Sequence, residues 1–303
     1  MSGAPAQPCG VLLLDKPAGF SSTQALARAK RLLAARKAGH TGTLDPFATG
    51  LLPLAFGEAT KFSRFLIDAP KAYDAVLALG EETPTGDIEG AVVARREVDV
   101  TTAQVDTVLA GFLGAQDQQP PMHSAVRVNG RRLYDYARAG VAVDRPVRRI
   151  EITHLARRRL EGTLLTVEVR SSKGTYIRTL AMDIGRVLGC GAHLRALRRT
   201  GTGPFRVEQA CTLEDLERDG VEAARARLLP MEALVTGLPR VDLGADAGKR
   251  FRQGQVVAHG PASEGSEWAL FGLGGAFLGI GRASAPGLLA PERVVSDGPV
   301  EGA

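Results

Sequence analysis

The sequence predicts a protein of the α+β class, with a large domain over residues 10–237 and a small β-rich module over residues 238–303. Three observations predict this organisation. Apolar runs of strand length alternate with segments whose apolar residues recur at helical spacing. Two strand-length runs, residues 150–160 and 164–170, are separated by a short turn, which indicates paired strands. Beyond the predicted boundary, the composition shifts to short apolar runs with many glycines.

The first half of the large domain is predicted from short apolar runs and capping signals. An apolar strand over residues 10–15 ends at Lys16-Pro17. Ser21 followed by Gln24 forms a capping box for a helix that continues to about Lys37. Further expected elements are a helical stretch over residues 59–66, a strand over residues 73–80, and a helix that begins with the capping pair Thr101 and Gln104 and continues to Phe112.

The second half continues with a helix from Ile177 whose apolar residues fall on one face. Strands are expected over residues 193–200 and 205–211, followed by two short helices between Thr212 and about Leu229. In the small module the expected strands lie around residue 256 and over residues 268–271, 277–283 and 293–295. The glycine-rich run GLGGAFLG between the middle two predicts a hairpin turn rather than a dinucleotide-binding loop, because no helix follows it.

Composition limits the cellular setting. The 303 residues are 44% hydrophobic, enough for a sizeable core, and no apolar run approaches the roughly 20 residues that cross a bilayer. Residues 1–9 are small and proline-rich, so we expect them to be disordered, and they lack a secretion signal. We therefore expect a cytoplasmic protein with no membrane partner. Cys190 and His193 have the spacing of half a zinc site, but no second half follows, so we expect no metal.

The basic residues suggest a polyanionic partner. The net charge is +5 and the pI is about 9.3. Residues 116–146 are polar and irregular except for an amphipathic piece over 133–137, and a long basic insertion of this kind is usually functional or disordered. Its cations alternate with aromatic residues, as suits nucleic-acid binding. The alternative is that arginine merely covers solvated faces. The residues concerned are Arg127, Arg131, Arg132, Tyr134 and Tyr136.

The segment from Gly39 to Gly57, GHTGTLDPFATGLLPLAFG, contains a single acidic residue, Asp45. Its glycines and prolines disfavour a helix or a regular strand, and Pro46 holds the preceding residue in an extended conformation. A carboxylate on a stiff loop is typical of a catalytic acid or nucleophile, because such a group must be held still. The alternative is a surface Asp-Pro turn.

Arg178 falls in the first turn of a predicted helix, where a cation opposes the helix dipole at a cost of roughly a few tenths of a kcal/mol. An arginine is favoured at that position only if an acidic residue forms an ion pair with it. We therefore hypothesise an ion pair between Arg178 and Asp45. The alternative is an arginine that faces solvent, since exposed charges cost little.

The Asp45 loop belongs to a series of short motifs that extends through most of the chain. They are Asp15-Lys16-Pro17 with Ser21-Ser22, HTGTLDP from His40, ATGLLP from Ala48, Lys71-Ala72-Tyr73, Thr83 to Asp87 with Gly90, Pro120-Pro121 with Ser124-Ala125, Leu133-Tyr134 with Ala137-Arg138, and KGTYIR from Lys173. In this order the motifs resemble those of the tRNA pseudouridine-55 synthase family, and so many matches are highly specific. Phe47, Arg127 and Ser171 depart from the family pattern without affecting a proposed catalytic role.

The resemblance implies that the chain isomerises one uridine in the T arm of tRNA, at position 55, to pseudouridine. Asp45 would be the nucleophile, attacking either C1′ of the ribose, as a retaining glycosidase does, or C6 of the base. Arg178 would pair with Asp45 and keep it ionised. Tyr73 would lie against the uracil ring as the candidate base, the alternative being a core tyrosine.

The resemblance also implies contacts with the substrate. Leu197 would pack on the other face of the base, which must leave its stack to enter the pocket. His40 would fill the space that the base vacates, and Asp87 would support the arginine network or position the substrate. The remaining expected contacts, to phosphates or within the structure, are Lys16, Lys61 and Lys71.

For the whole chain, the resemblance implies a mixed, mainly antiparallel central sheet flanked by helices. Residues 116–146 would form a thumb-like insertion that closes on the T-stem loop, and residues 238–303 a small RNA-binding module of the PUA type. We expect a monomer that needs no cofactor, metal or guide RNA. Two alternatives are a guide-RNA-dependent synthase, which the long insertion disfavours because guided enzymes delegate substrate capture, and an RNA-binding folding helper with incidental chemistry.

Overall fold

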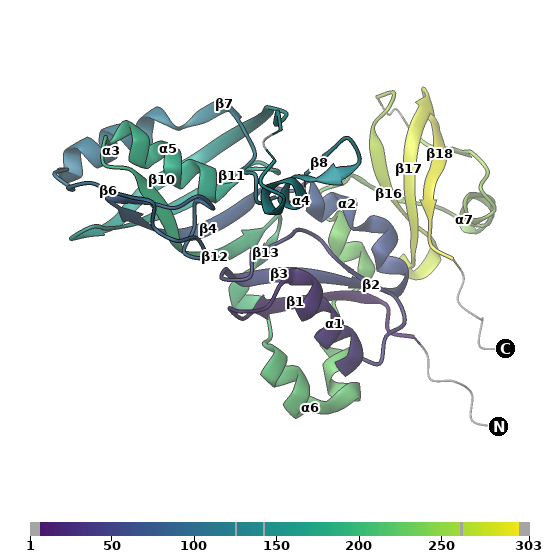
Figure 1. Ribbon diagram of the computed structural model, residues 1–303. Helices are drawn as coiled ribbons and strands as arrows, with labels where there is room; N and C mark the ends of the chain where they lie inside the picture. Colours follow the sequence, from purple (N-terminus) through teal and green to yellow (C-terminus); the bar gives the residue numbers. More distant parts are fainter. Residues whose placement is uncertain (1–6, 125, 142, 261–262, 297–303) are drawn as a thin grey trace.

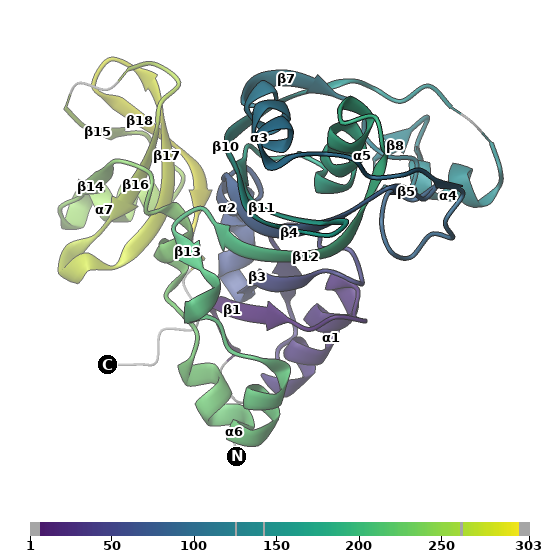
Figure 2. The ribbon, with the colours of Figure 1, turned by 90° about the vertical axis from the view of Figure 1, so that its left-hand side faces the viewer.

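The central element of the fold is one sheet. The computed structural model describes residues 7–124, 126–141, 143–260 and 263–296. In this part of the chain nine strands join in that sheet, as Figures 1 and 2 show. In spatial order they are β1 (Gly10–Lys16), β3 (Thr49–Phe56), β12 (Ala192–Thr202), β4 (Lys71–Leu79), β11 (Leu164–Ser171), β10 (Arg148–Glu161) and β7 (Gly114–Gln118), with β2 (Ala38–His40) on β3 and β13 (Phe205–Arg206) on β12.

The sheet is mixed and mainly antiparallel, as predicted. Within it only β3 and β12 run parallel, and they share just two paired positions, Thr49 with Arg198 and Gly50 with Arg199. Gly50 is required at this join, because its φ is +100° and a Cβ there would lie 2.3 Å from the carbonyl oxygen of Arg199. We call this parallel join the β3–β12 seam. It divides the hairpin half of the sheet (β1, β2, β3) from the long-stranded half.

Two helices fill the concave side of the long-stranded half, which curves around them in Figure 2. They are α3 (Thr102–Gly111) and α5 (Ile177–Val187). The predicted capping box between Thr101 and Gln104 is present at the start of α3. The buried face of α5 contributes Leu180, Ala181 and Ile184 to the main core, together with apolar residues of β4, β11 and β12.

On the hairpin half, α1 (Ser22–Leu32) and α6 (Leu213–Ala226) pack against each other. The capping box of Ser21 and Gln24 is confirmed, but the prediction that this helix continues to Lys37 was wrong. Ala34 has a φ of +48°, which turns the chain out of the helix so that residues 38–40 can pair with β3. Residues 1–6 lie outside the described residues, whereas Gln7, also predicted to be disordered, accepts a hydrogen bond from the backbone of Arg36.

Several short elements complete the large domain. The predicted strand over residues 205–211 was wrong beyond Arg206, because a 3-10 turn follows and Cys211 bonds to Leu13 instead. The insertion contains a small hairpin and a helix (Figure 1). The bounds are η1 (Gly57–Phe62), α2 (Arg64–Ile67), β5 (Glu81–Glu82), β6 (Ala94–Arg95), β8 (Arg127–Val128), β9 (Arg131–Arg132), α4 (Leu133–Arg138), η2 (Val207–Gln209) and η3 (Met231–Val235).

The C-terminal module is a five-stranded sheet in the order β14-β16-β17-β18-β15, drawn in yellow-green to yellow in Figure 1. Its elements are β14 (Arg240–Asp242), α7 (Ala245–Arg252), β15 (Val257–Ala258), β16 (Glu267–Phe271), η4 (Leu273–Gly275), β17 (Phe277–Ala285) and β18 (Leu288–Val294). The glycine-rich run forms the turn of the β16–β17 hairpin, as expected. β14 and α7 were not predicted, because their few apolar residues give only a weak periodic signal.

The module shares a core with the large domain. Phe271 and Ile280 belong to the same buried cluster as Phe62, Leu234 and Val235. The rings of Phe62 and Phe277 meet edge to face with centroids 5.1 Å apart. Among the described residues, no helix is long and apolar enough to cross a membrane.

Candidate active site

Asp45 lies on the loop between β2 and β3, and the backbone of this loop is fixed on both sides of it. The N–H of Leu44 donates to Ser22 Oγ (2.8 Å), and the same hydroxyl donates to the carbonyl of Leu44 (3.1 Å). The carbonyl of Pro46 accepts from the N–H of Gly19 (2.8 Å). The carboxylate is 31% exposed. The predicted rigid loop around a partly accessible acid is therefore present.

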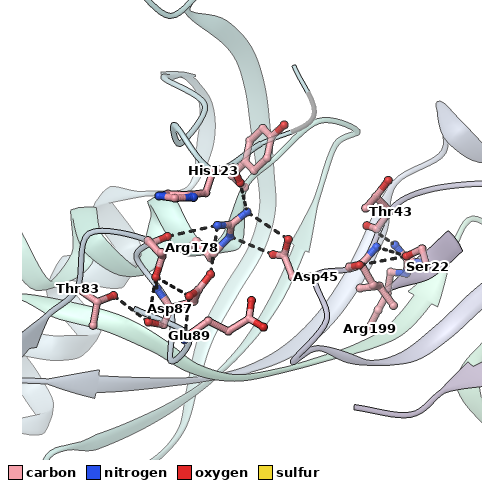
Figure 3. Close-up of polar contacts among 12 residues, drawn as sticks. Ser22, Thr43, Asp45, Thr83, Asp87, Glu89, His123, Arg178 and Arg199 are labelled. Carbon is pink, nitrogen blue, oxygen red and sulfur yellow. Dashed lines mark hydrogen bonds and ion pairs between the residues drawn. The ribbon is translucent and has the colours of Figure 1, made fainter. Parts of the chain in front are cut away.

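Arg178 pairs with Asp45 through two contacts. Its Nε lies 3.0 Å from Oδ2 of the carboxylate, and its Nη2 donates to Oδ1 over 3.2 Å. This bidentate arrangement fixes the orientation of the carboxylate plane as well as its charge. The hypothesised ion pair therefore exists, and Figure 3 shows both side chains.

Arg178 also binds a second carboxylate. Its Nη1 lies 3.1 Å from Oδ2 of Asp87 and 3.3 Å from the carbonyl oxygen of Thr85, while Nη2 donates to the carbonyl of His123 over 2.8 Å. With the two contacts to Asp45, these interactions give each of the three guanidinium nitrogens an oxygen partner, and the side chain is only 6% exposed. Arg178 therefore has no freedom to leave the site without leaving acceptors unpaired.

Asp87 is itself held in place by its own turn. The hydroxyl of Thr85 donates to Oδ1 (2.6 Å), the N–H of Glu89 donates to the same oxygen (3.0 Å), and Thr83 binds the backbone carbonyl (2.8 Å). The side chain of Asp87 is 2% exposed. The Thr83 to Asp87 motif thus builds a buried anion whose free oxygen faces Arg178.

Several influences on the pKa of Asp45 oppose one another. Burial raises the pKa of Asp45, and the positive charge of Arg178 opposes that shift, whereas the negative charge of Asp87 adds to it. Burial and the two neighbouring aspartates also raise the pKa of Glu89. The net effect is a carboxylate that is oriented by an arginine yet poorly solvated, which increases its nucleophilicity when it is ionised.

Tyr73 and Leu197 come from adjacent strands, β4 and β12, and both are largely buried in the main core. Burial raises the pKa of Tyr73, and the positive charge of Arg199 opposes the shift. Leu197 also lines an open cavity of about 540 Å³ that reaches the Asp45 loop at Phe47. Its other lining residues include Ala18, Thr49, Ile88, Glu89 and Arg195. Asp74, Val76 and Arg198 also line it, whereas Asp45, Tyr73 and Arg178 do not.

His40 lies at the end of β2 and is half-buried. Its Nδ1 is buried without a hydrogen-bond partner in the described structure. Burial and the charge of Arg199 lower the pKa of His40, so the ring is neutral near pH 7. A neutral, half-buried imidazole with an unused nitrogen is compatible with the predicted stacking role, which stays a prediction.

Two lysines that were expected to contact phosphates or other parts of the structure make structural contacts. Lys16 is fully buried, and its Nζ donates to the carbonyls of Pro17, Phe20 and Pro46. Lys71 is buried likewise, and its Nζ donates to three carbonyls at the end of α2 and in the following loop. Phosphate contact by either lysine would require breaking these bonds, so they favour the structural alternative of the expectation; RNA contact by these lysines stays untested.

Lys61 lies away from the site, at the contact between the two domains. Its Nζ binds Glu58 (2.5 Å), the carbonyl of Val294 (3.1 Å) and the hydroxyl of Ser296 (2.8 Å). These bonds connect η1 to the end of β18. The structure thus gives Lys61 a role in fixing the C-terminal module, and its expected phosphate contact has no support here.

The insertion presents its cations differently. The guanidinium of Arg131 lies 4.9 Å from the ring centre of Tyr136, and that of Arg138 lies 4.5 Å from the ring centre of Tyr134. Arg127 donates to the carbonyl of Gly130 (3.3 Å). Arg132 lies in β9. The predicted alternation of cations and aromatics therefore corresponds to stacked pairs, and RNA contact remains a prediction.

Many other arginines are already paired with acids. On β10, Arg157 donates twice to Asp106 (2.8 Å each) and Arg158 donates to Glu168 (3.1 Å). Such pairs reduce the local positive potential, so these arginines of β10 attract a polyanion less than unpaired arginines would. No cluster of three metal-ligating side chains occurs among the described residues, and Cys190 and His193 are both buried.

Sequence reasoning missed four residues of this site: Ser22, Glu89, His123 and Arg199. The bonds of Ser22 to the backbone of Leu44 were not predicted, because the neighbouring Ser21 explained the serines by its capping box. His123 contributes through its carbonyl oxygen, which no side-chain pattern can reveal. Arg199 falls in the strand expected over residues 193–200, and only the alternation of side chains between the two faces of that strand distinguishes it from Arg198.

Comparisons with known proteins agree with these features. A model of the TruB family pseudouridylate synthase N-terminal domain matches residues 30–177, and a model of the tRNA pseudouridylate synthase B C-terminal domain matches residues 178–236. A third, described as pseudouridine synthase II TruB, C-terminal, matches residues 239–295. The residue ranges matched by the second and third models adjoin close to the predicted boundary at residue 237.

Curated proteins named tRNA pseudouridine synthase B are similar over nearly the whole chain. That of Aromatoleum aromaticum is 51% identical, over 95% of this chain and 92% of its own length. That of Cupriavidus pinatubonensis is 52% identical, over 94% of each chain. Among solved structures, a Cbf5-Nop10-Gar1 complex matches with a TM-score of 0.74 and 29% identity, over 95% of this chain and 84% of that chain. An H/ACA RNP bound to a substrate RNA containing 2′-deoxyuridine matches with a TM-score of 0.74 and 28% identity, over 96% of this chain and 86% of that chain.

Proposed function

This chain belongs to the TruB family of pseudouridine synthases, and we propose that it converts the uridine at position 55, in the T arm of tRNA, with Asp45 as the nucleophile. The reaction breaks the bond between N1 of uracil and C1′ of the ribose and forms a bond between C5 and C1′. C5 then loses its proton and N1 gains one, so no redox partner or energy source is required.

The observation that carries this proposal is the bidentate pair between Arg178 and Asp45. A nucleophilic carboxylate must be ionised, correctly oriented and poorly solvated at the same time. Arg178 supports the first two conditions, and the burial of the loop supports the third. Attack at C1′ and attack at C6 of the base both need this arrangement.

The neighbouring side chains support a flipped base. Leu197 and Tyr73 lie on adjacent strands in the same core cluster, and Leu197 also lines a cavity that reaches the Asp45 loop at Phe47. A uracil that leaves its stack would replace lost stacking by contact with these two side chains. Tyr73 is the candidate for moving the C5 proton. His40, on the strand that precedes the loop, is the candidate to fill the gap in the RNA.

The decisive experiment compares wild type with Asp45→Asn on a T-stem-loop RNA that carries tritium at C5 of its uridines. Tritium is released only when C5 loses its hydrogen, and mapping of the product locates pseudouridine. We expect Asp45→Asn to lower the single-turnover rate by at least about 10³-fold while binding the RNA normally. Asp106→Asn is the matched control, because it makes the same chemical change at an exposed carboxylate on α3.

Two outcomes would contradict the proposal. Pseudouridine formation by Asp45→Asn at the wild-type rate would exclude this residue as nucleophile, and product at another uridine would exclude position 55. The same assay also tests the alternatives. We propose that the purified monomer acts on unmodified tRNA without a guide RNA, so a strict requirement for an added RNA would assign the chain to the guided mode of its structural relatives.

A further inference from the structure

Arg199, on β12, is a buried cation to which the mechanism above gives no role. It is 1% exposed and has the largest volume among the described side chains that are fully buried. Burial of an arginine costs several kcal/mol unless its donors are satisfied, so its partners indicate what it is retained for. Burial lowers the pKa of Arg199, and Tyr73 opposes that shift.

The guanidinium of Arg199 contacts the Asp45 loop on both sides of the acid. Its Nη2 donates to the carbonyl of Gly42 (3.2 Å) and its Nη1 to that of Thr43 (3.5 Å). Its Nε donates to the carbonyl of Leu51 (2.6 Å), the third residue of β3. Asp45 therefore lies in a segment whose two ends are bonded to one side chain.

The same guanidinium reaches the opposite wall of the site. Arg199 and Tyr73 are directly paired residues on β12 and β4, so their side chains extend from the same face of the sheet. The charge of Arg199 opposes the rise that burial causes in the pKa of Tyr73, so the two side chains interact electrostatically. One cation is thus bonded to the loop of the predicted nucleophile and paired across the strands with the predicted base.

This connection crosses the β3–β12 seam, the parallel join of the sheet. Asp45 belongs to the hairpin half, whereas Tyr73 lies on β4, Leu197 on β12 and Arg178 on α5, on the other side of the β3–β12 seam. Two paired positions alone hold the seam through the backbone. In Figure 3, Arg199 lies on one side of Asp45 and Arg178 on the other.

We propose that Arg199 is a positioning residue, which fixes the Asp45 loop across the β3–β12 seam relative to Tyr73. The proposal rests on the function given above, in which Asp45 and Tyr73 act on one uracil. Arg178 orients the carboxylate of Asp45, and Arg199 fixes the position of the loop that contains Asp45. Loss of Arg199 therefore displaces the reacting groups, whereas loss of Asp45 or Tyr73 removes a reacting group.

The test is Arg199→Lys, with Arg198→Lys as the matched control. Lysine keeps the charge but cannot bridge the three carbonyls with a fixed fork. Arg198 is adjacent and also crosses between β12 and the hairpin half, where it donates twice to Asp15 from the other face of the sheet. We expect Arg199→Lys to lower the single-turnover rate at saturating enzyme by about 10²-fold, and Arg198→Lys to leave it within about threefold.

Three readouts distinguish positioning from a loss of folding. The dissociation constant for the T-stem-loop RNA should change by less than about threefold, and urea unfolding should stay cooperative. The double variant Arg199→Lys with Tyr73→Phe should lose much less than the product of the single losses, because the two residues act together. A wild-type rate for Arg199→Lys, additive losses in the double variant, or a loss confined to RNA affinity would each overturn the proposal.

If Arg199→Lys does not fold, Gly42→Ala perturbs the same contact from the loop. The added methyl would lie 3.5 Å from Nη1 of Arg199, at a backbone φ of +149° that side chains rarely adopt. We expect the same pattern, a slower single turnover with unchanged RNA affinity, and normal kinetics for Gly42→Ala would contradict the proposal. Failure here is separable from failure of the proposed function, since wild type would still form pseudouridine and Asp45→Asn would not.

Discussion

Arg178 and Asp87 form a buried ion pair behind the predicted nucleophile, with 3.1 Å between Nη1 and Oδ2. Asp87 is almost entirely buried, so its charge is stabilised by Arg178 and by the donors of its own turn. Because Arg178 also binds Asp45, the buried pair holds the arginine at the position from which it orients the accessible carboxylate.

The first prediction concerns this buried pair. Asp87→Asn leaves Arg178 with one carboxylate instead of two, and breaking a buried pair costs about 3–5 kcal/mol. We expect the free energy of unfolding in urea to fall by about 3 kcal/mol and the single-turnover rate to fall by about 10-fold or more. Asp183→Asn, which removes a half-buried acid paired with Arg186 on α5, is the control and should affect only stability. A full rate for Asp87→Asn would show that Asp45 alone positions the arginine.

The second prediction concerns pH. Burial raises the pKa of Asp45 above the ordinary aspartate value of 3.8, although Arg178 opposes the shift. Asp45 therefore becomes protonated, and the rate falls, at a higher pH than a solvent-exposed aspartate would require. Arg178→Lys, which loses the bidentate pairing, should move this acid limb to higher pH still. Single-turnover rates measured from neutral pH down to about pH 4.5, under saturating enzyme, check both statements.

The raised pKa of Asp45 also affects the stability of the fold, because the ionised carboxylate destabilises it. A carboxyl group whose pKa is raised by folding binds its proton more tightly in the folded state, so ionised Asp45 costs stability as the pH rises through this window. Asp45→Asn removes that cost. At neutral pH we expect its free energy of unfolding to equal or exceed that of wild type, and a clear destabilisation would contradict the role of burial in raising the pKa.

Part of this site follows from local sequence, because local rules determine it. Asp45 is extended by Pro46, and the capping boxes at Ser21 and Thr101 depend only on residues three positions apart. The pair of Asp45 with Arg178 could be hypothesised because a cation in the first turn of a helix opposes the helix dipole and is favoured only when an acid pairs with it. The family motifs supplied the remaining site residues, which no periodicity reveals.

The rest depends on contacts between distant segments. Lys16 and Lys71 look like surface cations in the sequence, and only the packing of loops around them shows that backbone carbonyls enclose each ammonium group. Arg199 is indistinguishable from Arg198 until the face of β12 is known. The early end of α1 likewise depends on the pairing of β2 with β3, a tertiary contact that overrides helix propensity.

The third prediction separates structural from RNA-contacting cations. Lys71→Met leaves three buried carbonyls without their donor, so we expect the free energy of unfolding to fall by about 2–4 kcal/mol. The salt dependence of RNA affinity should not change, because the ammonium group of Lys71 is buried against these carbonyls. A smaller salt slope in Lys71→Met at unchanged stability would favour the phosphate contact that was the other alternative for this lysine.

The fourth prediction applies the same measurement to the insertion. Arg127→Glu and Arg131→Glu should each weaken binding of the T-stem loop and reduce the slope of log affinity against log salt by about one per lost phosphate contact. Arg157→Glu, on the exposed surface of β10, is the matched control, because Arg157 already pairs with Asp106. Equal effects of the three variants would indicate general charge attraction rather than a specific contact through the insertion.

The fifth prediction concerns the C-terminal module. Phe62 is fully buried between the two domains and packs on Phe277, so Phe62→Ala should lower the free energy of unfolding by about 3–5 kcal/mol. Arg64, which joins the same domains through Glu267 (2.6 Å) and Glu292 (3.0 Å), is more than a third exposed. Arg64→Ala should therefore cost only about 1 kcal/mol or less.

Removal of residues 238–303 combines these effects. It would expose the apolar surface of Phe62, Leu234 and Val235 that the module covers, so we expect the shortened chain to unfold at a lower urea concentration and to aggregate. Weakened RNA binding by the shortened chain would then report lost structure as well as lost contacts. If its unfolding midpoint and solubility instead match those of the full chain, the shared core contributes no stability, and the module is held by its charged contacts alone.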